Sequence, residues 1–202
     1  KTYASTTVNV QVFASGDDGE QNTAGTTNVI NSTDLEVPYD GLSPGYVGIR
    51  FQGVKIPNAQ VISKAELWWI GDEAQSAGTV TSTIWGHDVD DAALFTTTNS
   101  DVSGRATTTA SSTWTILATT IGGFATSSNV TTQVQEIVDR AGWTSGNDMA
   151  FILKGTNTNR RTFVAWDTAG GLAGPMLHVE YVVAGAAAPT TRRRYYISPI
   201  VQ

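Results

Sequence analysis

The sequence predicts an all-β fold in which two antiparallel sheets pack face to face, with one short helix. Several short segments alternate apolar and polar residues, which is the pattern of strands with one buried face. Only 15% of the 202 residues are charged, and threonine, serine and glycine take their place, as suits strands that also face water. The hydrophobic share of 40% is enough for a sizeable core.

The alternation is clearest at the start of the chain, where Val8, Val10 and Val12 point to one side with polar residues between them. Residues 59–73 form the longest expected strand. Further strands are expected at residues 45–57, 79–85, 112–124, 147–155, 160–168 and 174–183, and a short strand is expected within residues 28–38, before a turn at Tyr39–Gly41. About eight to ten short strands separated by turn residues predict an antiparallel jelly-roll β-sandwich. Residues 96–112 are rich in threonine and serine and are expected to form a long polar connection.

The hydrophobic period changes once, in the segment SSNVTTQVQEIVDRAGW. Four apolar residues recur there at helical spacing and would form one buried stripe. They are Val130, Val134, Ile137 and Val138. The pattern predicts one short helix at about residues 129–141.

The end of the chain differs in composition from the rest. Residues 185–191 are mostly small residues with one proline, as in a flexible hinge, and three consecutive arginines follow. Setting these three arginines apart from the 12 basic residues leaves 9 basic against 18 acidic side chains, a formal net charge of −9. The sequence therefore predicts a jelly-roll domain at residues 1–184 and a hinge with a basic and aromatic docking tail at residues 185–202.

Composition and motifs exclude several classes of function. An acidic domain repels phosphate backbones, so nucleic acid is not an expected partner of the body. No apolar run approaches 18 residues, so no membrane span is expected. The chain has no cysteine, which excludes disulfides and thiolate metal sites. Nucleophile-elbow, phosphate-loop and dinucleotide motifs are absent, and a non-enzymatic protein is expected.

Calcium is the metal that the acidic segments indicate, since it prefers several carboxylate and carbonyl oxygens supplied by loops. Two segments, GDDGE and HDVDD, concentrate such oxygens, and a third pair lies at residues 72–73. The candidate ligands are Asp17, Asp18, Glu20, Asp88, Asp90 and Asp91. A solvated acidic loop is the alternative for each segment. His87 opens the second segment, while His178 lies in a predicted strand and is expected to be structural.

Tryptophan can form a platform for a sugar ring, because sugar C–H faces pack well on an aromatic surface. Trp68 and Trp69 are neighbours in one expected strand and must point to opposite faces, so only one of them can enter a single core. The tryptophans that could face a glycan are Trp68, Trp69, Trp143 and Trp166. Burial in the core is the alternative for each of them.

Several segments in order carry a resemblance to a known group. These are SGDDGEQ, TDLEVPYDG, VGIRFQGVKIPNAQVISKAELWW, IWGHDVDDAALF, VTTQVQEIVDRAGWTSGNDMAFILKG and GPMLHVEYV. Together they resemble DNRLRE-type domains and jelly-roll carbohydrate-binding modules, β-sandwich domains of bacterial extracellular and phage structural proteins. The resemblance spans about Val8 to Val183 and is most specific at Gln135 to Asn147. It implies a non-catalytic module located outside the cell or on a virion surface.

Two functions are expected from these features. The first is a structural module of a virion, such as a capsid decoration or tail protein, or of a filament, which docks to neighbouring subunits through its C-terminal tail. The tail residues expected to make that contact are Arg192, Arg193, Arg194, Tyr195, Tyr196, Ile197 and Ile200. The alternative is a secreted module that recognises polysaccharide through exposed tryptophans.

Overall fold

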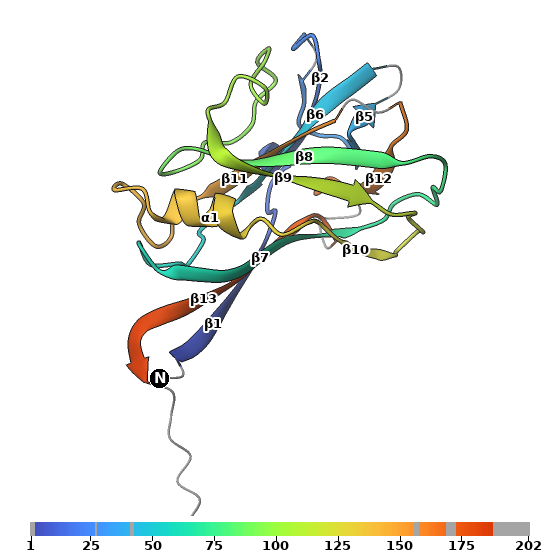
Figure 1. Ribbon diagram of the computed structural model, residues 1–202. Coiled ribbons are helices and arrows are strands. Elements are labelled where there is room, and N and C mark those ends of the chain that lie inside the picture. The colour runs from blue at the N-terminus through green and yellow to red at the C-terminus, as the bar shows by residue number, and fades with distance from the viewer. Residues whose placement is uncertain (1–2, 27, 41–42, 156–157, 169–172, 188–202) are drawn as a thin grey trace, which may run out of the picture.

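The computed structural model describes residues 3–26, 28–40, 43–155, 158–168 and 173–187. The described part of the chain is a sandwich of two β-sheets with one α-helix at its side (Figure 1). The predicted docking residues, 192–200, lie outside the described residues.

Eight strands form the framework of the two sheets of the sandwich, four in each. One sheet has the order β1 (Tyr3–Gln11), β13 (Met176–Ala187), β7 (Val61–Ile70) and β10 (Phe124–Thr126). The other contains β6 (Ser43–Phe51), β11 (Met149–Lys154), β8 (Val80–His87) and β9 (Thr107–Ile116) in that order. Ranked along the chain, these strands run 1-8-3-6 and 2-7-4-5, and each pairs with its neighbours antiparallel. This order is that of a jelly roll, so the predicted fold class is confirmed.

Short additional elements extend this framework. They are the 3-10 helix η1 (Ser15–Asp17) and the strands β2 (Asp18–Asn22), β3 (Asn28–Val29), β4 (Asp34–Val37), β5 (Tyr39–Asp40) and β12 (Arg161–Val164). β2 and β3 lengthen the larger sheet beside β6, and β5 also pairs with β6. β12 pairs with β4 in a small separate sheet.

The core between the two sheets is built from alternate residues of each strand. Trp69, Trp114 and Phe163 stack against one another there, with ring centroids 5.2–5.6 Å apart. Phe51 and Phe151 meet edge to face at 6.1 Å on neighbouring strands. Burying such large rings is the main source of stability in a sandwich of this kind.

The helix α1 (Thr131–Val138) lies within the predicted range and closes one side of the sandwich between β7 and β9 (Figure 1). The predicted apolar stripe is confirmed, because all four of its residues are fully buried. Polar side chains of the helix also bind neighbouring strands. Gln135 accepts a hydrogen bond from the backbone of Ile62, and Glu136 accepts bonds from the amides of Thr109 and Ala110. The helix therefore satisfies strand amides that would otherwise need another partner.

The segment after the helix, which contains Trp143 and Asn147, binds the backbone of two other loops. Trp143 is 1% exposed, and its indole Nε1 donates to the carbonyl oxygen of Ile56 at 2.9 Å. Asn147 donates through Nδ2 to the carbonyl oxygen of Asp90. The stretch Gln135 to Asn147, where the sequence resemblance is most specific, thus makes contacts that hold the fold together.

The connection between β8 and β9 folds across the outer face of the larger sheet. Phe95 and Val102 are buried there against Ala150 and Ile152, which form a second, smaller apolar cluster. Gly48 permits the contact, since a Cβ atom at that position would lie 2.5 Å from the Phe95 ring. The predicted long polar connection at residues 96–112 is wrong in its second half, where β9 begins at Thr107. A strand rich in threonine and serine fits there because its residues alternate between buried and exposed positions.

The chain leaves the sandwich at the end where it begins. β13 pairs with β1 through Ala187 opposite Tyr3, so strand pairing continues past the predicted domain boundary at residue 184. Figure 1 shows β1 and β13 running together away from the side on which β10 lies. No helix in the part of the chain that the structure describes could span a membrane.

Candidate functional site

The adjacent residues Trp68 and Trp69 on β7 point to opposite faces of the four-stranded sheet. Trp69 is 1% exposed and belongs to the core, whereas Trp68 is half-buried on the outer face. The sequence requirement that only one of them enters the core is therefore met. Trp68 is the member of the pair that a partner molecule can reach.

A groove runs over this outer face beside Trp68. Its volume is about 340 Å³, and most of its surface is carbon. Four strands contribute to it, because β1, β13, β7 and β10 lie side by side. The lining residues are Gln11, Trp68, Trp69, Ile70, Phe124, Ala173, Gly174 and Met176. Phe124 is 62% exposed on the rim of the groove.

The Trp68 ring is held in place from three sides. His178 stacks on it with ring centroids 4.4 Å apart and planes within 10°, and Phe124 meets it edge to face at 5.6 Å. The indole Nε1 donates to Glu66 at 3.2 Å, and Glu66 also pairs with Lys64. A ring fixed in this way loses little conformational freedom when a partner packs on it.

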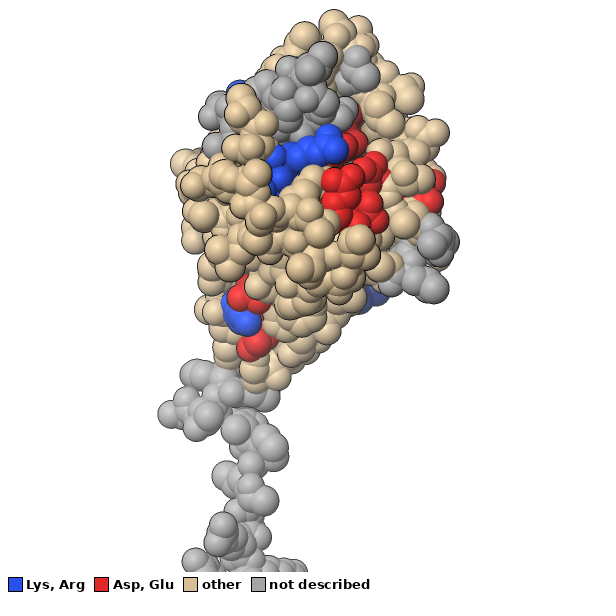
Figure 2. All heavy atoms as spheres, turned by 90° about the vertical axis from the view of Figure 1, so that its right-hand side faces the viewer, with Lys and Arg blue, Asp and Glu red and all other residues tan. Residues whose placement is uncertain are grey.

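The chain passes from the groove directly into a cluster of carboxylates. β7 ends at Ile70, and Asp72 and Glu73 follow after one glycine. Asp34 lies close enough to Asp72 to raise its pKa through like-charge repulsion, after the larger effect of burial; Glu73 adds to this repulsion. We call Asp34, Glu36, Asp72 and Glu73 the acidic cluster. Figure 2 shows acidic side chains gathered beside basic ones on the side of the sandwich where β10 and β12 lie in Figure 1.

One guanidinium group pairs with the acidic cluster. Arg160 binds Glu36 at 2.8 Å and approaches Glu73 at 3.9 Å. Arg161, the next residue, is buried and turns its guanidinium to the carbonyl oxygens of Ala77, Gly78 and Leu117, so it neutralises no carboxylate here. Among the described residues, these four carboxylates and the Arg160 guanidinium carry a formal net charge of −3 near the end of β7.

The structure corrects part of the predicted glycan-facing set. Trp69 and Trp143 are each 1% exposed, so the expectation that they face a glycan is wrong. The reason is long-range packing: Trp69 meets Trp114 and Phe163 across the core, as described above, and Trp143 is pinned beneath the loop after α1. Trp166 is half-buried with its ring 5.5 Å from Phe13, and together with Trp68 it stays a candidate.

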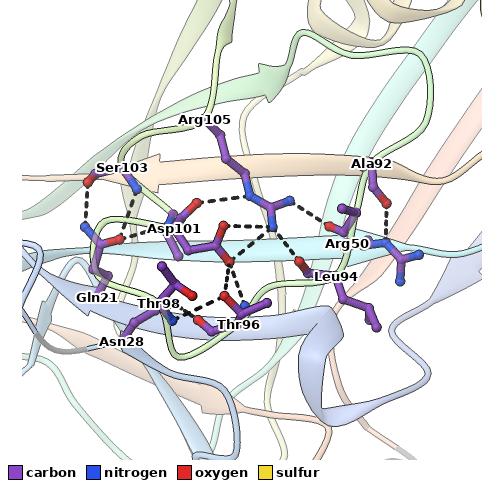
Figure 3. Close-up of polar contacts among 12 residues, drawn as sticks. Gln21, Asn28, Arg50, Ala92, Leu94, Thr96, Thr98, Asp101, Ser103 and Arg105 are labelled. Atoms are coloured by element: carbon purple, nitrogen blue, oxygen red, sulfur yellow. Dashed lines mark hydrogen bonds and ion pairs between the residues drawn. The ribbon is translucent and has the colours of Figure 1, made fainter.

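An arginine lies among the carboxylates that the sequence put forward for calcium. Arg50 is 7% exposed and pairs with Asp17 and Asp148, while its Nε donates to the carbonyl oxygen of Ala92 at 2.6 Å. Figure 3 shows this last bond beside the network in which Arg105 binds Asp101 and the carbonyl oxygen of Leu94. A guanidinium group thus supplies the positive charge beside Asp17 of the segment GDDGE.

The other candidate calcium ligands also have protein partners. Asp88 and Asp90 both bind Arg140, and Asp91 accepts a hydrogen bond from the backbone of Asp148. Glu20 is 7% exposed and accepts a bond from the backbone of Glu36. Among the described residues, no group of three or more histidine, aspartate or glutamate side chains is arranged to hold a metal ion. Calcium binding stays a prediction.

Asp18 is the most perturbed of these carboxyl groups. It is 1% exposed and accepts a hydrogen bond from the backbone of Trp166 at 2.8 Å. Burial raises the pKa of Asp18 to about 7, against the smaller lowering effect of that bond, and the charges of Asp167 and Asp17 raise it further. The pKa of His87 is shifted in the opposite direction by the same cause, because burial disfavours the charged imidazolium and lowers its pKa.

A scan against protein-family models finds no match for this chain, and a search of curated proteins finds none either. The resemblance to extracellular β-sandwich modules therefore stays a prediction, and the site has to be argued from its own geometry. The sequence did not single out Ile70, Phe124 or Met176 as site residues. Phe124 stands in a short strand whose partner residues were not evident from the sequence, so its exposure could not be foreseen.

Proposed function

We propose that this chain is a non-catalytic structural module of a virion or a surface filament, which docks to neighbouring subunits through its C-terminal segment. The observation that carries the proposal is the carbon-lined groove beside Trp68, with Phe124 exposed on its rim. An apolar groove of this kind suits a protein segment with large apolar side chains. Residues 195–201 of the chain, YYISPIV, have that composition.

Removal of residues 188–202 tests the proposal. β13 ends at Ala187, so this deletion leaves every described strand in place. We expect the shortened chain to keep the melting temperature of the full chain and to lose incorporation into purified particles or filaments, measured by co-sedimentation. A control variant that replaces residues 188–191 with a Gly-Ser linker of equal length should still be incorporated. Full incorporation of the shortened chain would refute the proposal.

Polysaccharide binding is the second candidate, and the outward ring of Trp68 is the observation that favours it. The ring is rigidly held and has a polar neighbour, Gln11, along the same groove. A sugar ring would stack on the aromatic surface that Trp68 and Phe124 form together. Phe124→Ala reduces this surface and should therefore weaken retention of the protein in polysaccharide-containing gels. If the chain is retained by none of a broad panel of polysaccharides, this candidate function is eliminated.

A further inference from the structure

We infer that the groove receives the C-terminal segment of a second copy of this chain, with the arginines of that copy placed at the acidic cluster. The inference rests on the proposed function and deepens it. It adds the receptor surface, the direction in which the segment lies and the symmetry of the resulting assembly.

Acidic and apolar residues follow one another along this surface in an order that matches the arginines and apolar residues along the segment. Asp72 follows the groove residue Ile70 by two positions where β7 ends, and the apolar surface continues back along β7 to Trp68. In the segment, three arginines at 192–194 come directly before Tyr195–Ile197. A segment that runs antiparallel to β7 therefore brings its arginines to the carboxylates and its aromatic and apolar residues to the groove.

The spacing of the residues along β7 also agrees with the spacing of the residues along the C-terminal segment. An extended chain advances about 3.3 Å per residue, so about 7 Å separate Ile70 from Trp68 along β7, and Asp72 follows two residues after the strand ends. The same step separates Tyr195 from Ile197, and Arg193 precedes Tyr195 by two residues. Alternate residues of an extended segment face the same way, so Arg193, Tyr195 and Ile197 would present one continuous face to this surface.

The charges at the polar end are of opposite sign, with Arg193 facing the acidic cluster and Arg192 and Arg194 on either side of it. The acidic cluster has a net charge of −3 after its pairing with Arg160, as counted above, and the segment carries three consecutive arginines. Guanidinium groups bind carboxylates with two parallel hydrogen bonds and fix the direction of the segment that carries them. The repulsion that contributes to the raised pKa of Asp72 would be relieved by such a partner.

The segment of the same chain cannot reach this position. Trp68 pairs with Met176, and the eleven-residue step from Met176 to Ala187 carries β13 away from the groove over about 36 Å. From Ala187 to Arg194 the chain spans at most about 25 Å when fully extended. The partner must therefore be another copy. Because the segment and the groove are different surfaces, the contact is head to tail, which generates a ring or an open filament.

Sedimentation velocity of the full chain over a range of concentrations tests the receptor surface. We expect Asp72→Asn with Glu73→Gln, and separately Phe124→Ser, to weaken self-association about tenfold or more. Leu117→Ser is the matched control for the apolar change, since Leu117 is 79% exposed outside the groove. Glu180→Gln is the control for the acidic change, because its side chain is 37% exposed on the same sheet and outside the cluster. Both controls should associate like the unchanged chain.

A mixing experiment tests the direction of the contact. A chain with Arg192→Glu, Arg193→Glu and Arg194→Glu should not associate alone, and neither should a chain with Asp72→Lys and Glu73→Lys. Their mixture should form assemblies in which the two variants alternate, since the acidic tail of the first meets the basic receptor of the second and the arginine tail of the second meets the unchanged acidic cluster of the first. A photo-reactive amino acid at position 195 or 197, on the face expected to meet the groove, should crosslink to peptides that contain Phe124 or Met176.

The outcomes separate this inference from the proposed function. Loss of assembly on removal of residues 188–202, together with full association of the receptor variants, overturns the receptor surface and leaves the proposed function standing. A full chain that is incorporated into particles yet stays monomeric at about 100 µM shows that the partner is a different protein. A monomer whose tryptophan fluorescence responds to a polysaccharide, with the response lost in Phe124→Ser, assigns the groove to a glycan. Each of these results refutes docking of a second copy.

Discussion

His178 and Trp68 stack with ring centroids 4.4 Å apart on the outer face of the four-stranded sheet, one on β13 and the other on β7. His178 is 7% exposed, and its Nδ1 lies 2.7 Å from Oδ1 of Asn9. The pair fixes the orientation of the only described tryptophan that lines the groove from the outer face. The expectation that His178 is structural agrees with this geometry.

The first prediction concerns this stacked pair. His178→Ala removes the ring that supports Trp68, and we expect a loss of about 1–2 kcal/mol in the free energy of unfolding together with a changed fluorescence spectrum for Trp68. Urea unfolding followed by tryptophan emission measures both. Glu180→Gln, which keeps the ring pair, is the control. An unchanged spectrum in His178→Ala would show that Trp68 does not depend on the histidine.

The second prediction concerns the buried guanidinium of Arg50. Arg50→Ala leaves Asp17, which is 0% exposed, without its charged partner. Removing one member of a buried ion pair costs about 3–5 kcal/mol, because the remaining charge stays desolvated. Arg160→Ala, at a more exposed ion pair, should cost about 1 kcal/mol or less. Chemical unfolding of both variants compares the two, and equal losses would contradict the central role of Arg50.

The third prediction is a pH dependence. The pKa of Asp18 is raised from 3.8 to about 7 in the folded state, so folding favours the protonated form. The stability from this group is full below about pH 4 and is lost as pH rises through about 7. Asp18→Asn mimics the neutral form and keeps an oxygen for the amide of Trp166. We expect it to gain about 2–3 kcal/mol over the unchanged chain between pH 5 and pH 8.

Thermal or urea unfolding of both proteins at the two pH values measures this difference. A constant difference between Asp18→Asn and the unchanged chain at pH 5 and pH 8 would refute the raised pKa.

The fourth prediction concerns the helix that closes the sandwich. Glu136 accepts hydrogen bonds from the backbone amides of Thr109 and Ala110 on β9. Glu136→Ala removes both bonds, and we expect a loss of about 1–2 kcal/mol. Hydrogen exchange at these two amides should become faster in this variant, whereas Glu136→Gln should keep partial protection. Unchanged exchange at both amides in Glu136→Ala would argue against this role.

Local patterns in the sequence were sufficient for the fold class. The alternation at Val8, Val10 and Val12 and the helical spacing from Val130 to Val138 report only on which side of one element a residue lies. Each element buries its apolar side, so period and burial agree without knowledge of the partner strand. The opposite placement of Trp68 and Trp69 follows from the same geometry.

The site depended on contacts between distant parts of the chain. The groove joins β1, β7, β10 and β13, whose pairing a local pattern does not specify. The sequence therefore named Trp143 as a glycan-facing residue although its indole is bonded beneath a distant loop to Ile56, and it put forward Asp17 for calcium although Arg50 binds it from another strand.

By itself, the sequence determined an acidic all-β domain with one helix, an apolar core and a basic, aromatic C-terminal segment of distinct composition, because periodicity and charge are properties of residues close together in the chain. Only the tertiary structure decided which tryptophan faces outward, which cation meets the buried carboxylates, and that four carboxylates from β4 and the end of β7 form an acidic cluster. Those features arise where strands from opposite ends of the chain become neighbours, and the free energy that selects them comes from packing and desolvation across those contacts.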